Sequence, residues 1–155
     1  MEPVYDEATA YHEAGHAVVA LALGRPVQRV SILPDRVRLG HCEFKKGKYR
    51  PSEDWLEREI LIALGGIAAE ARLTGDYAWD GAAHDHRYVS GLAVQRAGAR
   101  QSARLIQRLL AKAEHILGHE SNWRAVEFIA AELLQRGVIS GRTAQHLFDR
   151  GCEKC

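Results

Sequence analysis

The sequence lacks the features that mark membrane and secreted proteins. Its 155 residues contain no apolar run near the roughly 18 residues that a membrane span requires. The first seven residues, Met-Glu-Pro-Val-Tyr-Asp-Glu, are acidic and lack the basic-then-apolar layout of a signal peptide. We therefore expect a cytoplasmic protein that has no membrane partner.

Cysteine is scarce, with three residues in the whole chain, Cys42, Cys152 and Cys155. An odd count without a signal peptide argues against a disulfide framework. Cys152 and Cys155 have C-x-x-C spacing, but a structural zinc site needs four ligands and the chain has no second pair. We expect residues 151–155 to form a reduced tail.

The chain also lacks an excess of charge of one sign. Lys and Arg total 21 and Asp and Glu total 20, which gives a formal net charge of +1. No overall field therefore points to nucleic acid, and we expect none as a partner. Basic residues recur every four positions and would form a ridge on one continuous helix: Arg96, Arg100, Arg104, Arg108 and Lys112. No base-stacking aromatics accompany them, so we expect a solvated face.

Apolar residues recur at helical spacing along most of the chain. The length suits a single domain over residues 1–155. Two β-branched runs predict a hairpin over 27–33 and 37–44. The fold class is therefore mainly α (α+β), with a small β-hairpin or sheet and a C-terminal helical bundle. Caps at Asp6, Ser52, Ser121 and Ser140 help place the predicted helices, which span about 7–23, 53–73, 84–95, 101–117, 122–136 and 141–149.

The first predicted helix carries His12-Glu13-Ala14-Gly15-His16. Positions i and i+4 lie on one face of a helix, so His12 and His16 can bind one metal ion. Glu13 lies beside them, which is the layout of a zinc hydrolase with a carboxylate general base. Gly15 weakens a helix, and close approach of another backbone is one physical reason to keep it.

A hydrolytic zinc site takes three protein ligands and leaves one position for water. Spacing alone does not choose the third ligand. Asp85 and its neighbours follow a polar loop and begin a helix, which suits a long-range ligand, whereas Glu70 shares a helix face with Gly66. The candidates are Asp85, His84, His86, Glu70 and His41.

Four segments, in order, resemble the FtsH family of ATP-dependent zinc metalloproteases. They are residues 10–17 (AYHEAGHA), 27–34 (VQRVSILP), 64–70 (LGGIAAE) and 81–85 (GAAHD). Residues 103–117 and 125–134 resemble the end of the family's protease domain. The resemblance implies a helical, zincin-like peptidase domain that binds Zn2+, with His12, His16 and Asp85 as ligands and Glu13 as the catalytic base. Glu70 matches an acid of the family, and we expect it either to orient a zinc-bound histidine or to form a salt bridge.

The departures from the family shape the functional expectation. The sequence contains no ATPase domain or membrane segment, so we expect an endopeptidase that cuts flexible or unfolded polypeptides without ATP. The family's Gly-Gly-Arg is Gly-Gly-Ile67 here, which puts family-like hexamer contacts in doubt, and a homo-oligomer or a partner ATPase stays open. His84 replaces a family Asn, and His84 and His86 could modify metal affinity or bind substrate.

Two further expectations concern substrate and organisation. Zinc peptidases of this kind hold a peptide along a sheet edge. The strand over 37–44 is the candidate edge, with Leu39, Gly40 and His41 as its substrate-edge residues. His41 and Cys42 are the residues expected to face the cleft. We expect a zinc-site lobe over 1–97, a C-terminal helical part over 98–150 and the tail. The alternative function is a non-catalytic zinc-binding interaction module, possibly working with a separate unfoldase, but such a module would have no need of Glu13.

Overall fold

The computed structural model describes residues 6–34, 41–44, 53–78 and 83–153. Within these ranges the chain is mainly helical and contains one small sheet. The elements, in chain order, are α1 (Glu7–Ala22), β1 (Val27–Ser31), β2 (His41–Phe44), α2 (Glu53–Thr74), α3 (Ala83–Ala97), α4 (Ser102–Gly118), α5 (Glu120–Arg136), β3 (Val138–Ser140) and α6 (Gly141–Cys152).

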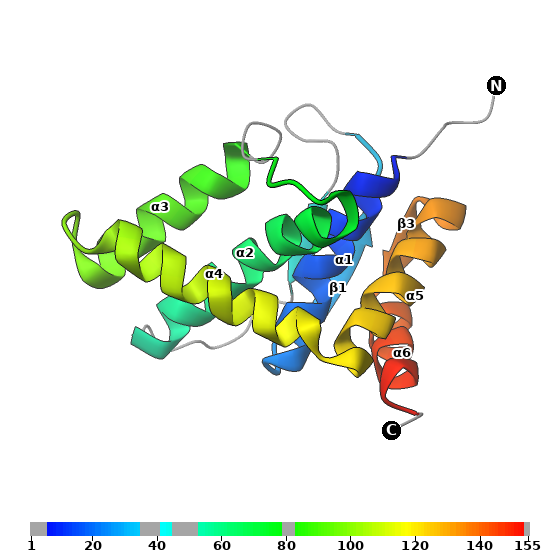
Figure 1. The fold of residues 1–155 in the computed structure, drawn as a ribbon. Helices are drawn as coiled ribbons and strands as arrows, with labels where there is room; N and C mark the ends of the chain where they lie inside the picture. The colour runs from blue at the N-terminus through cyan, green and yellow to red at the C-terminus, as the bar shows by residue number, and fades with distance from the viewer. Residues whose placement is uncertain (1–5, 35–40, 45–52, 79–82, 154–155) are drawn as a thin grey trace.

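Helices α1 and α2 pack together at the centre of the molecule (Figure 1). Helix α3 lies at one end, and α4 runs from that end along α2 to α5 (Figure 1). Helices α5 and α6 lie at the other end, where α5 packs against α1. The sheet is antiparallel with the order β2–β1–β3, so β2 lies at an edge. The predicted mainly α architecture with a small sheet is confirmed. None of the described helices combines the length and the apolarity needed to cross a bilayer.

The α1–α2 contact brings two backbones together. A Cβ atom built on Gly15 would lie 2.4 Å from the carbonyl oxygen of Gly65 and 2.5 Å from the Cβ of Ala69. Real Cβ atoms do not make such contacts, so the helices can be this close only because Gly15 has no side chain. The prediction that Gly15 permits a close backbone approach is confirmed.

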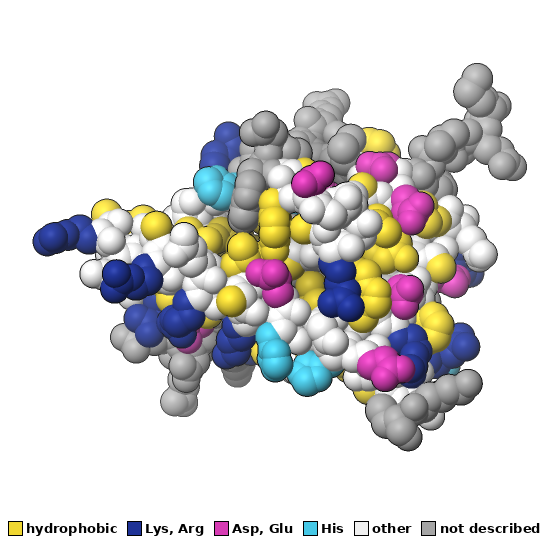
Figure 2. All heavy atoms as spheres, in the orientation of Figure 1, with side chains coloured by type: hydrophobic (Ala, Val, Ile, Leu, Met, Phe, Trp, Pro, Cys, Tyr) yellow, Lys and Arg dark blue, Asp and Glu magenta, His cyan; other side chains and the backbone are white. Residues whose placement is uncertain are grey.

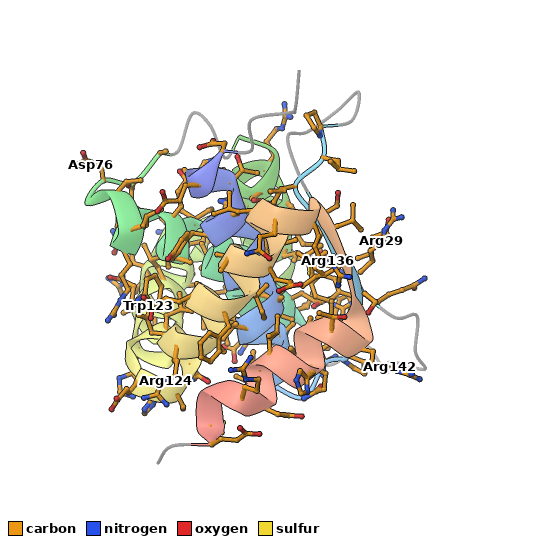
Figure 3. All side chains as sticks on the ribbon, turned by 90° about the vertical axis from the view of Figure 1, so that its right-hand side faces the viewer. Arg29, Asp76, Trp123, Arg124, Arg136 and Arg142 are labelled. Atoms are coloured by element: carbon orange, nitrogen blue, oxygen red, sulfur yellow. The ribbon has the colours of Figure 1, made fainter. Side chains whose placement is uncertain are left out.

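Contacts of Trp123, which is labelled on α5 in Figure 3, tie α5 to both central helices. The ring of Trp123 on α5 tilts against Tyr11 of α1, with 5.8 Å between ring centroids. The guanidinium of Arg72 on α2 lies 4.6 Å from the centroid of the Trp123 ring. The C-terminal helices therefore help to hold α1 and α2 together. The predicted division of the chain at residue 98 stays a prediction.

The helix caps were predicted with mixed success. Asp6 caps α1 by accepting a hydrogen bond from the Ala8 N–H at 3.1 Å, as predicted. Ser140 caps α6 in the same way, through the Thr143 N–H at 3.1 Å. The prediction for Ser121 is wrong, because α5 already begins at Glu120. His119 alone separates α4 from α5, so the chain has no room for a later cap.

The strands also differ from the prediction. Strand β3 was missed, because three residues carry no periodic signal and become a strand only by pairing with β1. Strand β1 ends at Ser31, two residues before the predicted end at residue 33. The Ser31 side chain is buried, and its hydroxyl accepts a hydrogen bond from the Leu33 N–H at 3.1 Å. The predicted residues 37–40 of the second strand and the predicted cap Ser52 lie outside the described residues.

The predicted ridge of basic residues is not continuous, because the helix is interrupted between α3 and α4. Gly98 there has a φ of 84°, in the left-handed region that ends helices. Arg96 and Arg108 both approach Glu57 of α2, at 3.7 and 2.9 Å, so part of the positive charge is compensated. In Figure 2 basic side chains gather toward the end where α3 lies, whereas acidic and basic side chains are mixed over the rest of this face.

The glycine contact predicts a specific effect on stability. Replacing Gly15 with Ala should lower the free energy of unfolding by about 1–3 kcal/mol, because the added methyl group pushes α1 and α2 apart. Gly91→Ala is the matched control, since a Cβ there meets nothing within 4 Å. It should raise stability by about 0.5–1 kcal/mol through helix propensity. Urea unfolding in EDTA measures both, and equal effects would contradict the close-packing explanation.

Candidate metal centre

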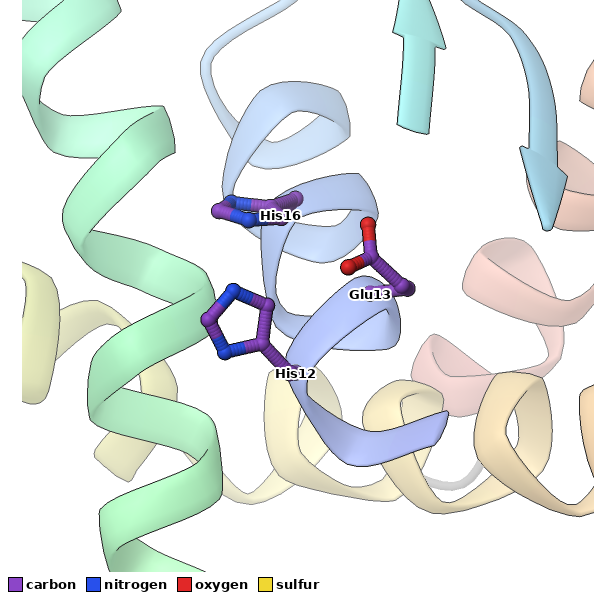
Figure 4. A group of neighbouring side chains, drawn as sticks. All are labelled: His12, Glu13 and His16. Atoms are coloured by element: carbon purple, nitrogen blue, oxygen red, sulfur yellow. The ribbon is translucent and has the colours of Figure 1, made fainter. Parts of the chain in front are cut away.

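Two buried histidines on α1 form the centre of the site. His12 and His16 are each 8% exposed, and their ring centroids lie 4.7 Å apart with the rings nearly perpendicular. Figure 4 shows both imidazoles on one side of α1, as their i, i+4 spacing predicts. The space beside His16 depends on Gly66 of α2. A Cβ there would lie 2.4 Å from the His16 ring, so a larger residue would displace the imidazole.

Helix α2 provides an oxygen partner for the Nδ1 atom of each histidine. His16 Nδ1 donates a hydrogen bond to the main-chain carbonyl oxygen of Ile62 at 2.7 Å. His12 Nδ1 lies 3.3 Å from the Glu70 carboxylate. Such contacts fix the tautomer and orientation of metal-binding histidines, and they direct each Nε2 toward the metal.

The Nε2 atoms meet a carboxylate from a third helix. Asp85 lies in the first turn of α3, and its Oδ2 is 2.6 Å from His12 Nε2 and 3.3 Å from His16 Nε2. Two imidazole nitrogens and one carboxylate oxygen therefore converge from two helices. These three donors, with both Nδ1 atoms held by oxygen acceptors, form a donor set suited to Zn2+.

Electrostatics in this cluster favour its charged form when no metal is bound. Burial lowers the pKa of His12, but hydrogen bonds to Asp85 and Glu70 outweigh burial and raise it to about 10. Burial also lowers the pKa of His16, yet the negative charge of Asp85 leaves it above its usual value. Burial raises the pKa of Asp85, but the two histidines hold it well below its usual range. A metal cation would therefore take the place of protons.

Glu13 lies beside the histidines but on another side of α1. It is 5% exposed, and its ligand atoms and those of His12 and His16 lie within 4.8 Å of one another. In Figure 4 its carboxylate turns back toward the side of α1 that carries the histidines. Burial raises the pKa of the Cys42 thiol on β2, and the charge of Glu13 raises it further, so this strand runs close to the carboxylate.

The structure shows which of the candidates for the third zinc ligand faces the Nε2 atoms of the histidines. Asp85 faces both Nε2 atoms, whereas Glu70 lies on the Nδ1 side of His12. His86 is exposed on α3. His84 and His41 belong to α3 and β2, but their side chains lie outside the described residues, as do Leu39 and Gly40 altogether.

Sequence reasoning missed one group at this site, the main-chain carbonyl of Ile62. An acceptor that belongs to the backbone has no side-chain signature. Only the three-dimensional approach of α2 to α1 shows that this carbonyl faces His16.

Comparison with known proteins identifies the family. The model of peptidase family M41 matches residues 1–99, which contain both histidines, Glu13, Glu70 and Asp85. The chain belongs to peptidase family M41. The predicted relationship to the FtsH family is thereby confirmed.

Curated relatives of this M41 chain are named as zinc metalloproteases. It is 40% identical over 94 residues to "ATP-dependent zinc metalloprotease FtsH 3" of Conexibacter woesei, covering 58% of this chain and 12% of that protein. It is 30% identical over 152 residues to the FtsH of Acidimicrobium ferrooxidans, covering 96% of this chain and 21% of that protein. It is 43% identical over 81 residues to the FtsH of Thermotoga maritima, covering 49% and 13%. The matches therefore span only 12–21% of these relatives' length.

The charged cluster predicts a pH-dependent stability for the M41 chain in EDTA. The pKa of His12 rises from 6.5 to about 10 on folding, so its contribution is fully present below pH 6.5 and is lost as the pH rises through 10. The pKa of Asp85 falls from 3.8, so its contribution is present above pH 3.8 and is lost as the pH falls.

The urea midpoint in EDTA should therefore decline between pH 6.5 and about 10. In Asp85→Asn this decline should be shallower, because the replacement removes the main partner of His12. An identical pH dependence in both proteins would show that the pair does not stabilise the fold.

Proposed function

We propose that this chain is a zinc-dependent endopeptidase domain that hydrolyses peptide bonds in flexible or unfolded polypeptides. One observation supports this most strongly: His12 Nε2, His16 Nε2 and Asp85 Oδ2 converge beside the buried carboxylate of Glu13. A structural zinc site would be closed by a fourth ligand and would have no use for this carboxylate. Membership of family M41 supports the same class of reaction.

In this proposal His12, His16 and Asp85 hold the zinc ion. When bound, the ion lowers the pKa of a water ligand toward neutrality and polarises the substrate carbonyl as a Lewis acid. The Ile62 carbonyl and the Glu70 carboxylate hold the two imidazoles in the orientation that this binding requires.

Glu13 carries out the proton transfers. Its carboxylate takes a proton from the attacking water, which adds to the scissile carbonyl carbon. The same carboxyl group then donates this proton to the amine that leaves as the C–N bond breaks. Because Glu13 is buried next to the histidines, it is held near the reacting atoms throughout.

Strand β2 is the proposed substrate edge. It pairs with β1 on one side, and in the sheet order β2–β1–β3 its other side faces away from the described strands. An extended peptide can add to such an edge through main-chain hydrogen bonds, which select for unfolded segments rather than for a particular sequence. We propose that Leu39, Gly40 and His41 extend this edge, and that His84 contacts substrate near Asp85.

Hydrolysis at this site needs no nucleotide, since all the proposed chemical groups come from α1, α2 and α3. The relatives are named ATP-dependent, and the ATPase activity in such proteins could deliver folded substrates to the site. We propose that the chain acts in the cytoplasm on unfolded polypeptides. Oligomerisation or a partner ATPase would extend its substrates to folded proteins.

The proposal makes Glu13 essential for turnover but not for metal binding. Glu13→Gln should lower cleavage of casein, an unfolded substrate, by about 100-fold or more, while zinc content stays near one ion per chain. Glu7→Gln is the matched control, because Glu7 is an exposed residue of the same helix. It should leave both quantities unchanged.

Two results would refute this assignment. If Glu13→Gln cleaves casein as fast as the parent protein, Glu13 is not the base. If the zinc-loaded parent protein cleaves no unfolded polypeptide, the non-catalytic interaction module becomes the better description. Zinc content measured by mass spectrometry on the same samples separates loss of metal from loss of the base.

A further inference from the structure

A second buried charged group lies outside the metal centre. Arg25 follows the C-terminal end of α1, and Glu59 lies on α2. The Glu59 side chain is 4% exposed and that of Arg25 is 14% exposed. Nη1 of Arg25 donates to both carboxylate oxygens of Glu59. The peptidase chemistry described above uses neither residue.

Arg25 joins three elements of the site. Its main-chain N–H donates to the Ala20 carbonyl oxygen at 2.8 Å, which fixes it to the end of α1. Its guanidinium binds Glu59 and thereby α2. The same guanidinium stacks on Phe44 of β2, with its carbon 4.4 Å from the ring centroid. A planar cation can make an ion pair at its edge and stack on an aromatic ring with its face.

Each of these attachments lies close to a group of the metal centre. Glu59 precedes Ile62 by three residues on α2, and the Ile62 carbonyl orients His16. Phe44 follows Cys42 by two residues on β2, so the two side chains lie on one face of the strand. Both side chains pack against the hydrophobic core, and β2 contacts α1, so this face of the strand is directed toward the zinc-binding helix.

Stability alone does not account for this ion pair. Removing two charges from water costs several kcal/mol, and an apolar pair of similar volume is often as stable or more stable. Two charge-assisted hydrogen bonds to one buried carboxylate, by contrast, hold the guanidinium in place, and with it anything stacked on its face.

We propose that Arg25 is a positioning residue that holds the substrate-binding strand β2 in place relative to the zinc-binding helix α1. The inference rests on the proposed peptidase function. The occupant of the positioned edge is the extended main chain of an unfolded polypeptide. Glu59 fixes the guanidinium, and the guanidinium fixes Phe44 and hence the edge.

The test uses three variants. Arg25→Lys keeps the charge but loses the planar group that stacks on Phe44. A double Met replacement of Arg25 and Glu59 removes both charges together and leaves no buried charge unpaired. Arg29→Lys is the matched control, because Arg29 lies on β1 and its 2.9 Å ion pair with Glu43 is exposed.

Steady-state cleavage of a fluorogenic peptide long enough to lie along β2 provides the first measurement. Arg25→Lys and the double Met variant should raise KM about fivefold, the size of one cation–π contact, while kcat and zinc content stay within about twofold. Arg29→Lys should change neither constant. Unchanged KM in both test variants, or a fall in kcat accompanied by loss of zinc, would overturn the positioning role.

Hydrogen exchange of the zinc-loaded proteins provides the second measurement, and it does not depend on turnover. Amides of residues 42–44 should exchange about fivefold faster in Arg25→Lys, while those of β3 keep the parent rate. Equal exchange at residues 42–44 would overturn the inference even if the parent protein cleaves the peptide. An inert parent protein with faster exchange in the variant would instead refute the peptidase proposal and leave the positioning role supported.

Discussion

The close contact between the backbones of α1 and α2 is the constraint on which the metal centre depends. Gly15 meets the main chain at Gly65, and Gly66 meets the ring of His16. This spacing places the Ile62 carbonyl within 2.7 Å of His16 Nδ1 and the Glu70 carboxylate within 3.3 Å of His12 Nδ1. Larger residues at these glycines would separate the histidines from the groups that orient them. The close packing of α1 on α2 therefore determines how the two histidines are oriented.

Buried charge in the described core is concentrated around two groups that serve different purposes. In the metal centre, carboxylates from α2 and α3 surround the two histidines and favour a cation between them. In the second group, the ion pair of Arg25 and Glu59 is already neutral and reaches β2 through Phe44. The first group is suited to binding a metal cation, whereas the second is suited to holding the edge strand β2 in a fixed orientation.

The sequence predicted those parts of the site that local spacing determines. The i, i+4 histidines lie on one face of α1, and the small residue between them lies against α2, as expected. The third ligand was only shortlisted from the residues. Asp85 is 69 residues beyond His16, and nothing local shows which of several acids and histidines reaches the metal. The family resemblance selected Asp85, and the structure places it against both Nε2 atoms.

Features formed by tertiary pairing escaped prediction. Strand β3 exists because β1 pairs with it, the Ile62 carbonyl is a main-chain group, and Arg25 and Glu59 meet across 34 residues.

The central claim is that zinc binds between α1 and α3. Anomalous diffraction at the zinc edge, from crystals of the purified chain, tests it most directly. We predict one peak per chain, about 2.0–2.2 Å from His12 Nε2, His16 Nε2 and an Asp85 oxygen. A peak held by other residues, or none at this site in zinc-soaked crystals, would contradict the claim.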